Sequence, residues 1–159
     1  RDSRILMRLL NSLFIYFFSL VLAQTISSNK EVISTSEAPK AIGPYSQAIK
    51  VGNTLYLAGQ IALDPKTGIM MQGSIEVQTH RVLQNLGAVL NAAGFSFSDV
   101  VQAQVFLANL DDYKAMNSIY AEYFNKAPPA RAVVEAAKIP RGALVEIMMV
   151  AVSANQYEP

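Results

Sequence analysis

The stretch PPARAVVEAAKIPRGALVEIMMVAV, residues 128–152, decides the fold. It contains two apolar, strand-like runs that are joined by Pro-Arg-Gly at 140–142, a sequence typical of a turn. Residues 143–152 are apolar at almost every position, which is the pattern of a β-strand covered on both faces. Glu146 lies within this run, and Arg131 opens the preceding one. Burying an unpaired carboxylate costs on the order of several kcal/mol, so these charges mark the region where function is expected.

The composition excludes several classes of site. The chain has 159 residues, of which 52% are hydrophobic, enough for the core of one domain. The sequence has no cysteine, which excludes disulfides and thiolate chemistry, and its single histidine argues against a zinc site. The net charge is +1 and the basic residues are scattered, which argues against a nucleic-acid-binding face. Chemistry must therefore come from arginine, carboxylate, tyrosine, amide or backbone groups.

The first 23 residues differ in character from the rest of the chain. Basic residues precede an apolar run, LLNSLFIYFFSLVLA at 9–23, and a polar segment begins at Gln24. This pattern predicts a secretory signal peptide over residues 1–23. The run is shorter than the ~20 apolar residues that span a bilayer, so we expect no stable membrane span in the mature domain. An uncleaved anchor, an organelle presequence and a cloning or gene-model artefact are the alternatives, and Met7 is a candidate initiator.

One domain follows this leader. Residues 24–40 are read as a linker, and residues 41–155 carry the patterns of a folded domain. Turn sequences at 52–53 and 64–68 separate runs with the composition of β-strands. The expected strands are 45–51, 54–59, 100–107 and the two runs within 128–152.

Two helices are predicted by apolar residues that recur every three or four positions. The first follows Ser74, a residue type that caps helices, and ends at Gly94. The second begins at Asp111 or Asp112 and is stopped by Pro-Pro at 128–129. The element order is then ββαβαββ, an α+β fold in which two helices cover one face of a single mixed sheet.

An oligomer is expected from the same pattern. The strands are apolar on both faces, but the two helices would cover only one face of the sheet. A monomer would therefore expose a large apolar patch to water. We expect copies of the chain to bury this face against one another.

Arg131 and Glu146 are the first candidates for chemistry. A fixed guanidinium binds a carboxylate through two charge-assisted hydrogen bonds; the alternative is an exposed arginine at a strand end. A carboxylate in a poorly solvated cleft has a raised pKa and suits acid–base catalysis; the alternative is a pair with Arg141. A hairpin turning near Arg141 would place Glu135 opposite Glu146, with Arg131 roughly 13 Å further along the same face. Contact between Arg131 and Glu146 within one chain therefore does not follow from spacing.

Four motifs carry a resemblance to a known family. They are GPYSQA at 43–48, LAGQI at 57–61, PPAR at 128–131 and VEI at 145–147. Their order and spacing resemble those of the RidA family, also called YjgF/YER057c/UK114, whose members are reactive-intermediate imine deaminases. The resemblance runs from about residue 33 to residue 152. It implies a chorismate-mutase-like homotrimer with clefts between its subunits.

The resemblance also implies an activity and a site. The activity is hydrolysis of 2-imino or enamine acids, such as 2-aminoacrylate/2-iminopropanoate and 2-iminobutanoate, to 2-oxo acids and ammonia, with no metal or organic cofactor. These intermediates damage pyridoxal-phosphate enzymes, so the implied role is protective. By position, Arg131 would bind the substrate carboxylate and Glu146 would orient or deprotonate the attacking water. The implied substrate-binding residues are Tyr45, Ala58, Gly59, Asn117, Arg131 and Val133. Gln60 follows Gly59 in a loop whose backbone, by the same resemblance, approaches the ligand.

Some of these residues also have a purely structural interpretation. A tyrosine that follows a Gly-Pro turn, such as Tyr45, often packs on that turn. Asn117 lies off the apolar stripe of its helix, where a solvent-facing amide is expected. Gly59 permits a close approach of the backbone to a ligand. His80 lies beside core positions and is interpreted as structural, since one histidine is a poor set of metal ligands.

The chain departs from the family pattern at several points. Ala58 stands where the family usually has serine, which removes a hydroxyl that can bind the substrate. Val133 replaces a cysteine that bacterial members often carry, and Met148 replaces the second glutamate of the V-E-I-E pattern. Family members are mostly cytosolic, mitochondrial or plastid proteins, whereas residues 1–23 predict secretion or organelle targeting. Ala58 bears on the rate or the substrate range rather than on the reaction class.

Two other functions stay open at this point. The fold could serve as a non-catalytic trimeric module that binds a small carboxylate or a partner protein, which Ala58 and the export signal favour weakly. An RNA-directed activity is sometimes attributed to the family, but the scattered basic residues argue against it, because nucleic-acid affinity comes from clustered phosphate contacts. Arg131 facing Glu146 in a cleft would favour the enzyme. Pairing of Glu146 with Arg141 would favour the module.

Overall fold

The structure, a computed structural model, describes residues 30–154. The predicted signal peptide, residues 1–23, lies outside this range and stays a prediction. Within the described part of the chain, no helix combines the length and the apolar character needed to cross a membrane.

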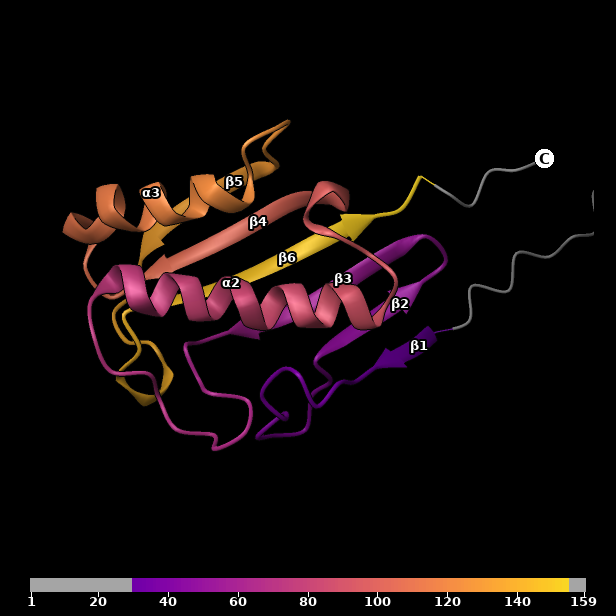
Figure 1. The fold of residues 1–159 in the computed structure, drawn as a ribbon, viewed down its shortest axis with the longest axis horizontal. Helices are drawn as coiled ribbons and strands as arrows, with labels where there is room; N and C mark the ends of the chain where they lie inside the picture. The colour runs from indigo at the N-terminus through magenta and orange to yellow at the C-terminus, as the bar shows by residue number, and fades with distance from the viewer. Residues whose placement is uncertain (1–29, 155–159) are drawn as a thin grey trace, which may run out of the picture.

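The described residues form one mixed six-stranded sheet with two helices on one of its faces (Figure 1). The elements are β1 (Lys30–Ile33), β2 (Ala48–Val51), β3 (Thr54–Gln60), α2 (Ile75–Ala92), β4 (Val100–Leu107), α3 (Tyr113–Tyr123), β5 (Ala130–Glu135) and β6 (Val145–Val152). The strand order is β1-β2-β3-β6-β4-β5. The predicted α+β fold, with one mixed sheet and two helices on one face, is confirmed.

Both helices form where the apolar spacing predicted them. Ser74 occupies the N-cap of α2 in an extended conformation, although its side chain makes no capping hydrogen bond. Gly94 follows α2 with a φ of 78°, a left-handed conformation that glycine adopts without strain. Asp112 precedes α3 at the end of a short 3-10 helix over residues 110–112. The apolar face of α2 packs against β3 and β6 and contributes much of the core.

Strand β1 lies within the range that the sequence predicted as a linker. Its four residues, KEVI, pair antiparallel with β2, and the last of them, Ile33, is buried in the core. A four-residue run with two charged positions has too little alternation to be identified locally. The strand forms because the edge of β2 offers unpaired backbone groups, which is a property of the assembled sheet. The element order is therefore βββαβαββ, with one strand more than predicted.

The predicted hairpin of the two C-terminal strands is wrong. β4 lies between β5 and β6, pairing parallel with β5 and antiparallel with β6. A parallel pair needs a long crossover connection, and α3 supplies it between β4 and β5. The turn residues at 140–142 therefore connect strands that are not neighbours. As a result, Phe106 and not Glu135 is the pairing partner of Glu146.

The central place of β6 explains its apolar sequence. It pairs with β3 on one side and with β4 on the other, and its residues alternate between the faces of the sheet. The odd-numbered residues from Val145 to Ala151 are buried beneath the helices. The even-numbered residues from Glu146 to Val152 are half-buried on the face without helices, which we call the open face. Tyr56 lies on the open face beside β6 and is 52% exposed, so apolar surface suited to an oligomer contact is present there.

Candidate functional site

Glu146 lies next to an irregularity in strand β3. The pairing of β3 with β6 shifts register between Leu57 and Gln60, which marks a β-bulge. The bulge brings the backbone of Gly59 so close to Glu146 that a Cβ atom at position 59 would collide with the carboxylate. Glycine is the residue that allows this approach, which gives a physical reason for its place in the LAGQI motif.

A pocket of about 350 Å³ opens beside this contact. Its lining is mainly apolar and comes from the loop before β2, the bulge of β3, the segment that follows β3, and Pro140. Glu146 and Lys40 are the charged lining residues. We call this space the Glu146 pocket. It brings together four of the residues predicted for the site, Tyr45, Ala58, Gly59 and Glu146. Gln60, the next residue of the LAGQI motif, also lines it.

The carboxylate of Glu146 is poorly solvated and unpaired. Burial raises the pKa of Glu146 above the ordinary value of 4.5. Among the described residues, no side chain or N–H group forms a hydrogen bond or an ion pair with it. Arg141, the partner considered from the sequence, donates instead to the carbonyl oxygen of Gly68 at 3.0 Å. Glu146 is therefore a free carboxylate with a higher proton affinity than a solvated glutamate has.

Tyr45 packs on its turn and also lines the Glu146 pocket. Its ring lies against Gly43 in the preceding turn, and its hydroxyl accepts a hydrogen bond from the Ile42 N–H at 3.3 Å. The same side chain lines the Glu146 pocket and remains 48% exposed. The turn thus fixes the ring while one side of it stays open to the pocket.

Arg131 lines a different space, a hollow of about 380 Å³ between α3 and the Pro-Pro segment at 128–129. One guanidinium nitrogen, Nη2, donates to Asn117 Oδ1 at 2.7 Å and to Tyr113 Oη at 3.2 Å. The guanidinium carbon also lies 4.4 Å from the centre of the Tyr120 ring. These contacts hold the arginine in place, so it differs from a freely exposed side chain at a strand end. We call this space the Arg131 hollow.

The Glu146 pocket and the Arg131 hollow lie on opposite faces of the sheet. Arg131 pairs with the buried Ala103 of β4, so its side chain is on the helix-covered face. Glu146 pairs with Phe106, three positions further along β4, and lies on the open face. The expectation that both residues share a face depended on the hairpin and is wrong. Within one chain, Arg131 does not face Glu146 across a cleft.

Two more of the predicted site residues accompany Arg131. Asn117 accepts the hydrogen bond from Arg131, so it is not merely a solvent-facing amide. Val133 lies two positions along the same strand, pairs with Val105 and packs against the hydrophobic core. The predicted site residues thus form two groups, one beside Glu146 and one beside Arg131.

Comparison with known proteins identifies the family. Residues 35–153 match the model of the family described as endoribonuclease L-PSP. The chain belongs to this L-PSP family, also known as the YjgF/RutC/RidA family.

Individual L-PSP relatives match most of this chain. A RutC family protein of Pyrococcus horikoshii is 52% identical over 122 residues, which cover 77% of this chain and 97% of that protein. The 2-iminobutanoate/2-iminopropanoate deaminase of Mus musculus is 46% identical over 123 residues, 77% of this chain and 91% of that protein. The crystal structure of E. coli TdcF with bound serine superposes with a TM-score of 0.76 at 34% identity, covering 79% of this chain and all of that one.

Two tyrosines that contact Arg131 in this L-PSP chain were not predicted as site residues. The spacing of apolar residues in the second helix places Tyr113 and Tyr120 on its apolar stripe, and Tyr120 is indeed buried in the core. A periodic pattern identifies a buried ring but does not reveal a cation above it, because Arg131 comes from a separate strand. Burial raises the pKa of Tyr120 to about 12, so its phenol is neutral at physiological pH.

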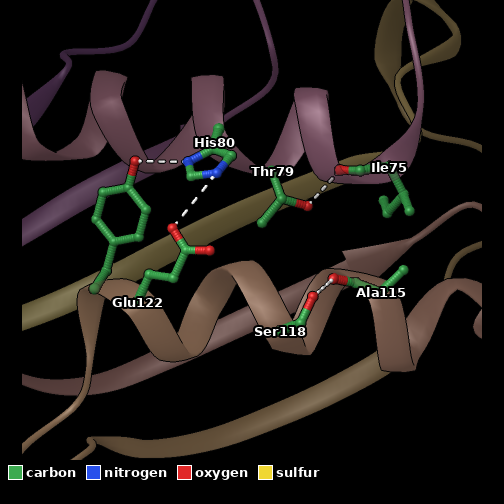
Figure 2. A network of polar contacts seen from close by, with 7 residues as sticks. Ile75, Thr79, His80, Ala115, Ser118 and Glu122 are labelled. Atoms are coloured by element: carbon green, nitrogen blue, oxygen red, sulfur yellow. Dashed lines mark hydrogen bonds and ion pairs between the residues drawn. The ribbon is translucent and has the colours of Figure 1, made fainter.

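His80 joins the two helices of the L-PSP domain (Figure 2). Its Nδ1 atom lies 3.1 Å from the hydroxyl of Tyr123, and its Nε2 atom lies 3.6 Å from Oε2 of Glu122. Over residues 30–154 there is no group of three or more side chains placed to ligate a metal. The contacts of His80 fit the structural role predicted for it.

Proposed function

We propose that this L-PSP family member hydrolyses 2-imino acids, such as 2-iminopropanoate and 2-iminobutanoate, to 2-oxo acids and ammonia. One observation carries the proposal: the unpaired carboxylate of Glu146 lies in an apolar pocket, and burial raises its pKa. Such a group accepts a proton from water more readily than a solvated carboxylate does. The 46% identity to the Mus musculus 2-iminobutanoate/2-iminopropanoate deaminase supports this activity.

The proposed reaction needs one group that accepts and returns protons. Glu146 removes a proton from water as the water oxygen bonds to the imine carbon. The electron pair of the C=N double bond moves to nitrogen, which takes the proton from Glu146 and leaves a tetrahedral carbinolamine. Glu146 then moves the hydroxyl proton to the amine, the C–N bond breaks, and the 2-oxo acid and ammonia leave. Glu146 ends in its starting ionisation state, and no electron donor or acceptor takes part.

Arg131 is proposed to bind the carboxylate of the substrate. Asn117 and Tyr113 engage only Nη2, and no described residue accepts a hydrogen bond from Nη1 or Nε. The N–H groups of Nη1 and Nε are free to donate charge-assisted hydrogen bonds to a carboxylate. The serine bound to E. coli TdcF is a small molecule with such a carboxylate, which supports this class of ligand.

A site that uses both charged groups requires two copies of the chain, because Arg131 and Glu146 lie on opposite faces of the sheet. We propose a homotrimer in which the Glu146 pocket of one subunit meets the Arg131 hollow of the next. The apolar open face supports such an association, since burial there would remove Tyr56 from water. Ala58 lines the Glu146 pocket without offering a hydroxyl, so substrate binding relies on the other groups.

The test uses the full chain and imines generated in place. An amino acid oxidase or dehydratase produces 2-iminopropanoate or 2-iminobutanoate, and semicarbazide traps the imine that remains. We expect wild type to lower the trapped imine and Arg131→Ala to leave it unchanged. If wild type has no effect on either imine, the proposed function is wrong for this chain.

A non-catalytic module that binds small carboxylates is the second candidate, favoured by Ala58 in the pocket. Titration calorimetry with serine and 2-oxobutanoate separates it from the enzyme. Binding that Arg131→Ala abolishes, together with an inactive wild type, would establish the module. RNA cleavage by wild type but not by Glu146→Gln would instead favour the activity that the family description names.

A further inference from the structure

Gln47 is a buried residue of the GPYSQA motif to which the proposed reaction assigns no role. It lies just before β2, and only 4% of its surface is exposed. Its Oε1 atom accepts a hydrogen bond from the Thr35 N–H at 2.7 Å. Its Nε2 atom donates to the carbonyl oxygens of Thr35, Ala38 and Pro39 at 3.0, 3.2 and 2.8 Å. The carboxamide therefore holds the whole segment from Thr35 to Pro39.

The backbone of Gln47 contacts a second part of the molecule. Its carbonyl oxygen accepts a hydrogen bond from the Ala58 N–H at 3.0 Å. Ala58 directly precedes Gly59, the residue against which the carboxylate of Glu146 lies. One residue thus joins the 35–39 segment to the bulge of β3.

Both of these parts form walls of the Glu146 pocket. Pro39 and Lys40 line it on one side, and Ala58 and Gly59 line it on another. The Glu146 side chain has no hydrogen-bond partner among the described residues, so its position and solvation depend on the packing of the pocket walls. A displacement of about 1 Å at a reacting group can change a rate by as much as 100-fold.

We propose that Gln47 is a positioning residue that holds two walls of the Glu146 pocket together and keeps water from the Glu146 carboxylate. The role rests on the proposed function of that pocket. An amide is required here because the side chain must both accept from an N–H and donate to carbonyl oxygens. A glutamate would place its oxygens against three carbonyl oxygens, and a hydrophobic residue would leave these groups without partners.

Gln47→Met is the informative variant, since it keeps the length of the side chain and removes its hydrogen bonds. We expect kcat to fall about 10- to 100-fold while KM changes less than about 3-fold, because Arg131 binds the substrate from a separate region. Without the hydrogen bonds of Gln47, the two pocket walls should also separate and admit water to the Glu146 carboxylate. The pKa of Glu146 should then fall towards 4.5, and the acid limb of the pH profile should move to lower pH.

Gln78→Met is the matched control. Gln78 is another buried glutamine, 5% exposed, whose side chain donates to the Met71 carbonyl and accepts from the Leu144 N–H. Neither of these partners lines the Glu146 pocket. We expect Gln78→Met to lower the melting temperature as Gln47→Met does, but to keep the kcat and the acid limb of wild type.

The pKa of the Glu146 carboxyl can also be measured directly by carbon-detected NMR. Lys40 and Tyr45 are the other titratable residues that line the pocket. This measurement needs no substrate, so it tests Gln47 even if wild type proves inactive and the proposed function fails. An unchanged pKa of Glu146 in Gln47→Met, or equal kinetic losses in both variants, would overturn the role. If Gln47→Met does not fold, Gln47→Asn, which is one methylene too short to reach the same carbonyls, takes its place with the same expected shifts.

Discussion

The Glu146 pocket and the Arg131 hollow differ in the contacts that they give their charged side chains. Arg131 is held by an amide, a phenol and an aromatic ring of α3. Glu146 is left without a polar partner and lies against the backbone of Gly59. A guanidinium keeps its charge in any environment, so contacts fix it without changing its protonation. Hydrogen bonds to a carboxylate would lower its pKa and weaken it as a base. In the proposed reaction, the group that binds the substrate is therefore fixed by contacts, and the group that accepts the proton is kept free of them.

The largest expected effect follows from removing the free carboxylate. Glu146→Gln keeps the size of the side chain but cannot accept a proton, so we expect kcat to fall about 10²- to 10⁴-fold. In wild type, kcat/KM should fall on the acid side around a pKa that lies above 4.5, since the base must be deprotonated. A full pH profile of kcat/KM measures this, and an acid limb at or below 4.5 would contradict the assignment of Glu146.

Glu146→Gln should lower activity but increase the stability of the fold at neutral pH. The pKa of Glu146 is higher in the folded state than in the unfolded chain, so the folded state loses stability as pH rises from 4.5 through the raised pKa. Glu146→Gln removes this loss. Thermal unfolding at neutral pH should show a melting temperature at or above that of wild type, and the difference should disappear at acidic pH.

Removing Arg131, which is proposed to bind the substrate carboxylate, should have the next largest effect. Arg131→Ala should lower kcat/KM about 10²- to 10³-fold, the equivalent of roughly 3 to 4 kcal/mol for a charged pair that loses one partner. Each proposed site joins the Glu146 pocket of one subunit to the Arg131 hollow of another. If equal amounts of the Arg131→Ala and Glu146→Gln chains are refolded together, about a quarter of the sites should combine an intact Glu146 with an intact Arg131 and regain activity. Complete lack of recovery in co-refolded mixtures would show that the two regions do not share a site.

A smaller effect is expected where the backbone approaches Glu146. Gly59→Ala adds a Cβ atom that collides with the carboxylate, so we expect kcat to fall roughly 10-fold as Glu146 moves. Gly52→Ala is the control, because Gly52 has a φ of 59° but no atom within 4 Å of an added Cβ. It should destabilise the fold by about 1 kcal/mol without a kinetic change. Similar kinetics in both variants would contradict the claim that the close approach of Gly59 to Glu146 matters for kcat.

The smallest effect is expected from the ring beneath Arg131. Tyr120→Leu should raise KM about 3- to 10-fold, because a cation over an aromatic face contributes about 0.5 to 2 kcal/mol. Tyr120→Phe keeps the ring and removes a buried hydroxyl that has no hydrogen-bond partner among the described residues, so its KM should match wild type. A raised KM in Tyr120→Phe would show that the hydroxyl, not the ring, acts on Arg131.

Local patterns in the sequence were enough to predict much of the fold. Strand β4 has the predicted bounds, 100–107, and both helices lie where three- and four-residue spacing placed them. Strand β1 was not predicted, because four residues with two charges carry no periodicity of their own. The hairpin was predicted wrongly, because the turn at 140–142 looks the same whether it joins neighbouring strands or distant ones.

The candidate site was predicted only in its parts. Motif positions named Glu146, Gly59 and Arg131, and the burial of a lone carboxylate was foreseen from the apolar run around it. The contacts of Arg131 with Tyr120 were not foreseen, because they join a helix to a strand that follows it after a loop. The role of Gln47 was likewise hidden, since its partners precede it by 8 to 12 positions in an irregular segment.

The sequence by itself determined the kinds of element, the family and the residues able to do chemistry, because periodicity and motifs are local properties of a chain. Only the tertiary structure decided which of those residues lie together. Within one strand, alternation fixes which residues share a face, but it does not say which strand will be the neighbour or which face the helices will cover. Insertion of β6 between β3 and β4 placed Glu146 on the open face, and the parallel crossover through α3 placed Arg131 on the other.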